Sequence, residues 1–264
     1  MTDKPASVGE EVLYEVADHI AVVTLNRPDK RNAVNGAVAT AMDWIVKEIE
    51  RDDDVRVAIL TSSLESTFCA GADLSEISKG NSKALSTKDG GFAGFVKSAR
   101  TKPWIAAVRG NALAGGCELP LTCDMIVAAD NSRFGLPEVK RGIFAGAGGV
   151  FRLPRALPRN IALEIVATGD PLPAERMYQL GLVNRMVASE EVLAEAKSLA
   201  AQIGANAPLA VRKSLDVARQ AYDGTEEELW AASTAASIEV FSSEDAKEGP
   251  LAFLEKRAPV WKGR

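Results

Sequence analysis

The stretch of sequence that decides the fold is "GNALAGGCELPLTCDMIVAADNSRFGLPEVKRGIFAGAGGVFRLPR", residues 110–155. Glu118 stands there among small and apolar residues, and Glu138 follows twenty residues later, behind a proline that fixes a turn. A carboxylate that is buried without a partner costs several kcal/mol, or its pKa shifts until it is neutral. Each glutamate therefore faces water, pairs with a cation, or is needed inside.

Two interpretations of this pair follow from the residues alone. Two carboxylates in apolar surroundings are the usual equipment for acid–base catalysis, because burial raises their pKa towards neutrality. The alternative is a pair of structural glutamates held in salt bridges, and the spacing does not decide between the two. The candidate cationic partners are Lys140, Arg141, Arg109 and Arg152.

The composition indicates a soluble globular protein. The chain has 264 residues, 47% of them hydrophobic and 25% charged, with a formal net charge of −5. No basic block interrupts this acidity, which argues against nucleic-acid binding. The sequence shows no signal peptide and no membrane-spanning apolar run, so we expect a cytoplasmic protein. Cys69, Cys117 and Cys123 are too few and too irregular for a disulfide framework or a zinc site.

Histidine is the most informative count, because the chain has only one. His19 lies in "VADHIAVVTLNRP" (16–28), where we expect the turn of an N-terminal hairpin. Ser/His/Asp triads, Cys/His dyads and histidine-rich metal sites are therefore poor candidates. Acid–base chemistry would have to come from carboxylates.

The pattern of elements indicates an α/β core followed by helices. Strands and helices alternate to about residue 187, which is typical of a sheet covered by helices. Residues 189–257 favour consecutive helices. We therefore divide the chain into a core domain, 1–200, and a helical C-terminal region, 201–264. The individual elements expected in the core include an N-terminal hairpin ending near Asn26, a helix capped by Asn35, a mobile loop near 78–91 and a helix around 92–101.

Three glycine-rich turns follow strands or open helices: "FCAGADL" (68–74), "ALAGGCEL" (112–119) and "FAGAGGVFRL" (144–153). Such turns let backbone amides converge on one point, as in an oxyanion hole. Tight turns and close helix packing are the commoner use of glycine. None of the three has the spacing of a phosphate loop or a dinucleotide fingerprint.

Taken together, residues 68–74, 110–155 and "TGDPLPAERMYQLGLVNRMV" (168–187) resemble the crotonase superfamily, and specifically its enoyl-CoA hydratases. The resemblance covers nearly the whole chain. It implies an α/β fold, a crotonase-like spiral of ββα units with a helical C-terminal part that forms trimers. It also implies an acyl-CoA thioester substrate, no metal, no further cofactor, and a homotrimer or a dimer of trimers.

The resemblance also assigns roles at the reaction centre. Glu118 would activate water for attack at C3 of a trans-2-enoyl-CoA, and Glu138 would deliver a proton to C2. The backbone amides of Ala70 and Gly115 would form the oxyanion hole for the thioester oxygen. The backbone of Gly146 would help to hold the water.

Further residues resemble the binding positions for CoA. The turn "NRPDKRNAV" (26–34) would meet the CoA adenine and pantetheine, and "LAFLEKR" (251–257) resembles a helix that reaches the CoA of a neighbouring subunit. The loop near 78–91 would border the acyl pocket. The candidate CoA contacts are Lys30, Arg31, Ala33, Ala70, Asp73, Leu74, Phe253 and Lys256.

The expected activity is hydration of an enoyl-CoA in the breakdown of fatty acids or related acyl-CoAs. "GGFAGF" (90–95) and the tail 243–264 are similar to carnitinyl-CoA dehydratases, which keep both glutamates. Enoyl-CoA isomerases share the scaffold but usually keep only the second carboxylate. A non-catalytic, RNA-binding relative is the remaining alternative, and both the acidic balance and the two carboxylates argue against it.

Overall fold

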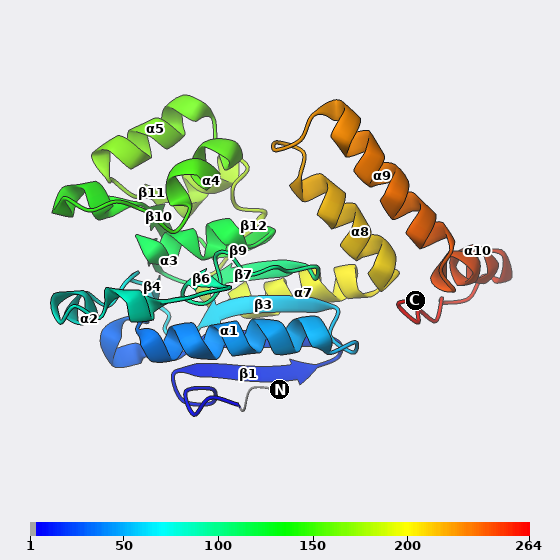
Figure 1. The fold of residues 1–264 in the computed structure, drawn as a ribbon, viewed down its shortest axis with the longest axis horizontal. Coiled ribbons are helices and arrows are strands. Elements are labelled where there is room, and N and C mark those ends of the chain that lie inside the picture. Colours follow the sequence, from blue (N-terminus) through cyan, green and yellow to red (C-terminus); the bar gives the residue numbers. More distant parts are fainter. Residues whose placement is uncertain (1–3) are drawn as a thin grey trace.

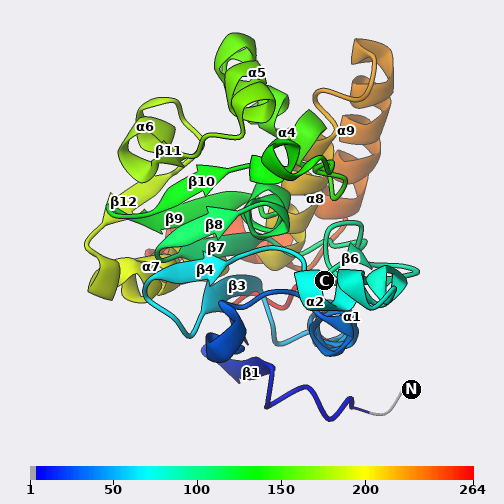
Figure 2. The same ribbon diagram turned by 90° about the vertical axis from the view of Figure 1, so that its left-hand side faces the viewer.

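A computed structural model describes residues 4–264 and shows two main sheets (Figures 1 and 2). Within that range, the larger sheet has six strands in the order β1-β2-β3-β7-β9-β12, and the smaller has four in the order β11-β10-β8-β4. The strands of the larger sheet are β1 (Val12–Ala17), β2 (Ile20–Leu25), β3 (Val57–Ser62), β7 (Trp104–Val108), β9 (Met125–Ala129) and β12 (Arg185–Val187). Those of the smaller sheet are β4 (Thr67–Cys69), β8 (Asn111–Leu113), β10 (Arg133–Gly135) and β11 (Leu172–Pro173).

Successive strands alternate between the two sheets, and this alternation generates a spiral. β3, β7 and β9 lie side by side and parallel in the larger sheet, while the strands that follow them, β4, β8 and β10, lie parallel in the smaller one. Each turn of the spiral therefore contributes one strand to each sheet. The expected α/β spiral of ββα units is confirmed.

Helices cover the sheets because each has an apolar face. In α1 (Gly36–Arg51), Val38, Met42, Ile45 and Ile49 are buried at helical spacing against the core. α7 (Val192–Gly204) buries Val192, Ala196 and Ala200 against the other face of the larger sheet. The remaining helices of the core are α2 (Leu74–Ser78), α3 (Gly115–Glu118), α4 (Gly149–Ala156), α5 (Arg159–Thr168) and α6 (Ala174–Gln179).

The C-terminal helices extend away from the sheets (Figure 1). They are α8 (Pro208–Arg219), α9 (Glu226–Phe241) and α10 (Asp245–Glu255). All residues of α8 and α9 are described, and none of them is buried in the single chain. The proposed boundary at residues 200/201 falls inside α7, which packs on the sheet; the helices that stand apart begin at Pro208.

The N-terminal predictions are confirmed. His19 occupies the β1–β2 turn with a φ of 65°, and the side chain of Asn35 accepts a hydrogen bond from the amide of Val38 at 2.8 Å. In the part of the chain that is described, no helix has the length and apolar character needed to cross a membrane.

The expected helix around 92–101 is wrong, because the chain forms turns there instead. Residues 78–91, expected to be a mobile loop, contain a 3-10 helix (Ser82–Leu85) and the first part of a short hairpin of β5 (Ser86–Thr87) and β6 (Gly91–Phe92). Ala93 and Gly94 then have φ values of 56° and 66°, which are not helical. A Cβ on Gly94 would lie 2.1 Å from the carbonyl oxygen of Ala39, so the segment is pressed against α1.

Candidate active site

Glu118 lies at the end of α3, a helix of four residues that directly follows β8. Its side chain is buried, with the residue 2% exposed. The backbone amide of Gly149, the first residue of α4, donates a hydrogen bond of 2.8 Å to Glu118 Oε1. An amide at a helix N-terminus suits a carboxylate, because it has no intrahelical partner.

Burial raises the pKa of Glu118 to about 7, and the nearby negative charge of Glu138 acts in the same direction. The hydrogen bond from Gly149 and the positive charge of Arg152 oppose this rise. A carboxyl group that titrates near neutrality can both accept and donate a proton under ordinary conditions.

Glu138 lies in a 3-10 helix, Pro137–Arg141, and is 6% exposed. Burial raises its pKa as well. Its Oε2 atom is buried and has no hydrogen-bond partner among the described residues. Because buried polar atoms are normally paired, an orphaned carboxyl oxygen is a good candidate for a substrate contact.

The salt-bridge interpretation of the two glutamates is wrong. Among residues 4–264, no lysine or arginine forms an ion pair with either glutamate. Of the cations considered as partners, Lys140 pairs with Asp170 and Arg109 contacts Glu65 at 3.7 Å.

Arg152, on α4, binds backbone carbonyls instead of a carboxylate. Its Nη1 donates to the carbonyl oxygen of Ala147 at 2.9 Å, and its Nη2 donates to that of Val96 at 2.8 Å. The guanidinium group thus ties the glycine turn before α4 to the segment that follows the β5–β6 hairpin. Since the same turn carries the Gly149 amide, Arg152 helps to fix the hydrogen bond to Glu118. The sequence did not predict this role, because Arg152 was considered there only as a salt-bridge partner.

The two glycine turns expected to form an oxyanion hole are in contact. Gly71 has a φ of +91°, and a Cβ there would lie 3.0 Å from the backbone nitrogen of Gly115. A Cβ on Gly116 would lie only 2.0 Å from the carbonyl oxygen of Cys69, so α3 approaches β4 as closely as a backbone permits. The amide of Gly115 opens α3 and by position has no intrahelical acceptor.

The backbone pattern favours Ala72 over Ala70 as the second donor. The amide of Ala70 already donates to the carbonyl oxygen of Arg31 at 3.1 Å. Val34 forms a parallel bridge with Ala72: it donates to the oxygen of Gly71 at 2.8 Å and accepts from the amide of Asp73 at 2.9 Å. In a parallel bridge the N–H of the opposite residue points away, so the amide of Ala72 faces away from Val34. Ala72, which the sequence did not single out, therefore has the better-placed amide of the two.

The same hydrogen bonds join the turn 26–34 to the segment 70–73. Two of the segments predicted to bind the substrate are therefore in contact. Lys30 and Arg31 are exposed there, and Ala33 is half-buried. Leu74, at the start of α2, is 55% exposed.

Asp73 has structural partners in this structure. Its Oδ1 caps α2 by accepting from the amide of Ser75 at 3.0 Å, and its Oδ2 accepts from Arg27 at 3.2 Å. The hydroxyl of Ser75, and then Arg27, hold the pKa of Asp73 below its usual range, against the effect of burial. A contact of Asp73 with CoA remains a prediction.

The roles predicted for Gly146 and for residues of the C-terminal helix stay predictions. Gly146 lies in the turn before α4, and the amide of Gly149, the first residue of that helix, binds Glu118. Phe253 on α10 is 83% exposed, and Lys256, which caps the end of that helix, is exposed as well. This helix lies at the opposite end of the long axis from α2 (Figure 1). The predicted roles of Phe253 and Lys256 would need a neighbouring subunit.

The alternating strands and the two buried glutamates beside a pair of abutting amide turns define the protein as a crotonase-type α/β spiral. The sequence matches the enoyl-CoA hydratase/isomerase family over residues 15–264, and the chain belongs to that family.

Similar proteins carry two kinds of name. A carnitinyl-CoA dehydratase of Shigella flexneri and one of Escherichia coli (strain K12) are each 42% identical over 250 residues, which cover 93% of this chain and 95% of theirs. The crystal structure of an enoyl-CoA hydratase from Mycobacterium tuberculosis H37Rv has a TM-score of 0.92 at 45% identity, covering 96% of this chain and 99% of that one. The carnitinyl-CoA hydratase from Mycobacterium avium has a TM-score of 0.76 at 46% identity, covering 97% and 99%.

Proposed function

We propose that this protein is a hydro-lyase that adds water across the C2=C3 bond of a trans-2-enoyl-CoA, or removes it from the 3-hydroxyacyl-CoA. The observation that carries the proposal is the state of Glu118 and Glu138. Both carboxyl groups are buried, both have a raised pKa, and neither has a cationic partner in the described chain. Family membership supplies the substrate class.

In the hydration direction, Glu118 acts as the base. It takes a proton from water, whose oxygen forms the new bond to C3. The π electrons move towards the thioester carbonyl, and Glu138 then gives its proton to C2 of the enolate. The Gly149 amide donates to Glu118 and favours its carboxylate form, and the acid role of Glu138 follows from the resemblance to the family. Dehydration reverses these roles.

The thioester oxygen gains negative charge during this reaction. We assign its stabilisation to the amide of Gly115 and to that of Ala72, in place of the originally expected Ala70. Donors that are fixed by the fold stabilise such a charge without reorganisation, and removing one typically costs about 10²–10³ in kcat.

The apolar side chains near the site suit an acyl chain. Leu74 and Ile77 on α2, with Ile143 and Phe144 after the second glutamate, are exposed in the single chain. The exposed faces of α8 and α9 fit a trimer, or a dimer of trimers, in which Phe253 and Lys256 reach a neighbour's CoA. CoA enters as part of the substrate, and the cytoplasmic location remains a prediction.

A carnitinyl-CoA dehydratase activity is the second candidate, because relatives with that name share 42% identity over most of the chain. It would use the same two glutamates on a polar, cationic acyl group. The difference between the candidates lies in the acyl group and not in the mechanism.

The test measures the loss of enoyl-thioester absorbance with crotonyl-CoA, and separately with crotonobetainyl-CoA, for the wild type, Glu118→Gln and Glu138→Gln. We expect turnover of at least one substrate by the wild type, and a loss of about 10²–10⁴ in each variant. Glu164→Gln, an exposed change on α5, is the matched control and should keep full activity.

Different results separate the alternatives. Hydration that survives Glu118→Gln would contradict the base role of Glu118. Formation of the conjugated 2-enoyl thioester from a 3-enoyl-CoA that survives Glu118→Gln but is lost in Glu138→Gln would support an isomerase, which needs a single carboxylate. Turnover of neither substrate by a folded wild type that still binds CoA would overturn the proposal. The ratio of the two substrates' kcat/KM values assigns the acyl group.

A further inference from the structure

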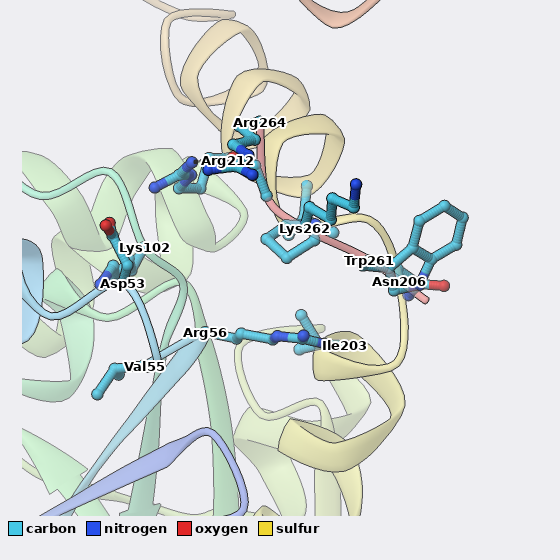
Figure 3. Close-up of a pocket in the computed structure, with 13 residues that line it drawn as sticks. Asp53, Val55, Arg56, Lys102, Ile203, Asn206, Arg212, Trp261, Lys262 and Arg264 are labelled. Carbon is cyan, nitrogen blue, oxygen red and sulfur yellow. Dashed lines mark hydrogen bonds between the residues drawn. The ribbon is translucent and has the colours of Figure 1, made fainter. Parts of the chain in front are cut away.

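A cavity of about 450 Å³ lies between the core and the C-terminal region, away from the two glutamates (Figure 3). Its walls come from the amino-terminal ends of β3 and β7, the junction between α7 and α8, and the tail after α10. None of the candidate active-site or CoA-binding residues lines it. Its volume is within the range of small-molecule sites in proteins.

The cavity is strongly cationic in a protein of net negative charge. Figure 3 shows Lys102 and Arg56 on one side and Arg212 and Arg264 on the other. The charged residues that line it are Arg56, Lys102, Arg212, Lys262 and Arg264, with Asp53 as the single acid.

Two of these cations have no carboxylate partner within the described chain. Arg56 donates only to the carbonyl oxygen of Gly204, at 2.8 Å, and Arg212 only to that of Gly263, at 3.4 Å. By contrast, Lys262 and Arg264 both pair with Glu244. The excess positive charge is therefore concentrated at the two arginines.

Lys102 adds a buried cation to this set. It is 1% exposed, and its Nζ donates to the carbonyl oxygens of Ile49 and Asp52 at the end of α1. Burial lowers its pKa, the acidic side chain of Glu50 opposes this, and the positive charge of Arg212 lowers it further. Lys102 and Arg212 thus repel each other across the cavity, and an anion between them would relieve that repulsion.

We propose that this cavity binds a small phosphorylated anion. The planar guanidinium groups of Arg56 and Arg212 match phosphate oxygens in fork geometry. Ile203, Pro208 and Val211 offer an apolar wall for the organic part of such a ligand. An occupant would contact both the core and the C-terminal region, and would stabilise their attachment. This proposal does not depend on the catalytic function.

Isothermal titration calorimetry of the full chain with inorganic pyrophosphate tests the proposal. We expect one site per chain, with an affinity that falls as salt is added. Arg212→Gln and Arg56→Gln should each weaken binding about tenfold, because each removes charge-assisted hydrogen bonds. Arg176→Gln, an exposed change on α6, is the matched control and should leave binding unchanged.

A competition experiment identifies the site that is occupied. With saturating CoA present, pyrophosphate should bind as before; displacement by CoA would place the probe at the thioester site and overturn the proposal. Absence of pyrophosphate binding, or equal binding by both arginine variants and wild type, would also overturn it. Tighter binding of citrate than of pyrophosphate would overturn the assignment to phosphate.

Discussion

Replacing Glu118 with glutamine should stabilise the protein above neutral pH while abolishing its activity. The carboxyl group of Glu118 is buried. Burial makes its ionisation unfavourable and so raises its pKa from 4.5 to about 7. Glutamine is neutral at every pH and nearly isosteric. Its side-chain oxygen can still accept the hydrogen bond from the amide of Gly149.

The magnitude follows from the pKa difference between the folded and unfolded chains. Below pH 4.5 both states hold the proton of Glu118, and its burial then carries no ionisation cost. As the pH rises from 4.5 to about 7, the folded state loses stability relative to the unfolded one, by 1.36 kcal/mol per pKa unit, or about 3 kcal/mol for this shift. The variant escapes that loss, so its advantage should appear between pH 4.5 and 8.

The assay is denaturant unfolding at pH 5, 6, 7, 8 and 9, at a fixed protein concentration because assembly shifts apparent stability. The free energy of unfolding of Glu118→Gln minus that of the wild type should rise by about 2.5 kcal/mol between pH 5 and pH 9, because part of the effect has already occurred at pH 5. Glu138→Gln should change in the same direction, and the exposed control Glu164→Gln should show no trend. A Glu118→Gln difference that stays constant with pH would refute the argument from burial.

Two further predictions concern the supports of the site. Arg152→Gln should lower kcat roughly tenfold and shift the acidic limb of the kcat/KM pH profile to higher pH. The variant loses two hydrogen bonds and a cation that lowers the pKa of Glu118. Arg155→Gln, on the same helix, is the control and should do neither, so equal effects in both variants would contradict the role of Arg152. Gly116→Ala should destabilise the protein by about 3 kcal/mol or more in denaturant unfolding, since its Cβ would lie 2.0 Å from the oxygen of Cys69. Gly204→Ala, in open space at the end of α7, should be neutral or slightly stabilising, and a similar loss there would count against the packing argument.

Much of the fold and the catalytic pair could be predicted from sequence, because the signals are local. The apolar spacing of α1 and its Asn35 cap are readable without a partner. Glu118 and Glu138 could be singled out because a carboxylate in an apolar run needs a reason. Their freedom from salt bridges could not be predicted, since it depends on where distant cations lie; Lys140, for example, turns to Asp170.

Other features depend on backbone geometry and tertiary packing. The choice between Ala70 and Ala72 depends on which amides the neighbouring strand occupies, and only the bridge to Val34 decides it. The false helix at 92–101 has a helical composition, but close contact of Gly94 with α1 imposes turns. The cationic cavity is lined by segments that lie between residue 53 and residue 264, far apart in the sequence, so no local sequence pattern predicts it.

The bridge between Val34 and Ala72 would couple the binding of one end of a long substrate to the alignment of the other end. The turn that would hold the nucleotide end shares one hydrogen-bonded ladder with the strand that would face the reacting thioester. Binding energy gained at the distant end can therefore align the donor at the reacting end. On the proposed function, a thioester that lacks the nucleotide portion should lose turnover rate as well as affinity.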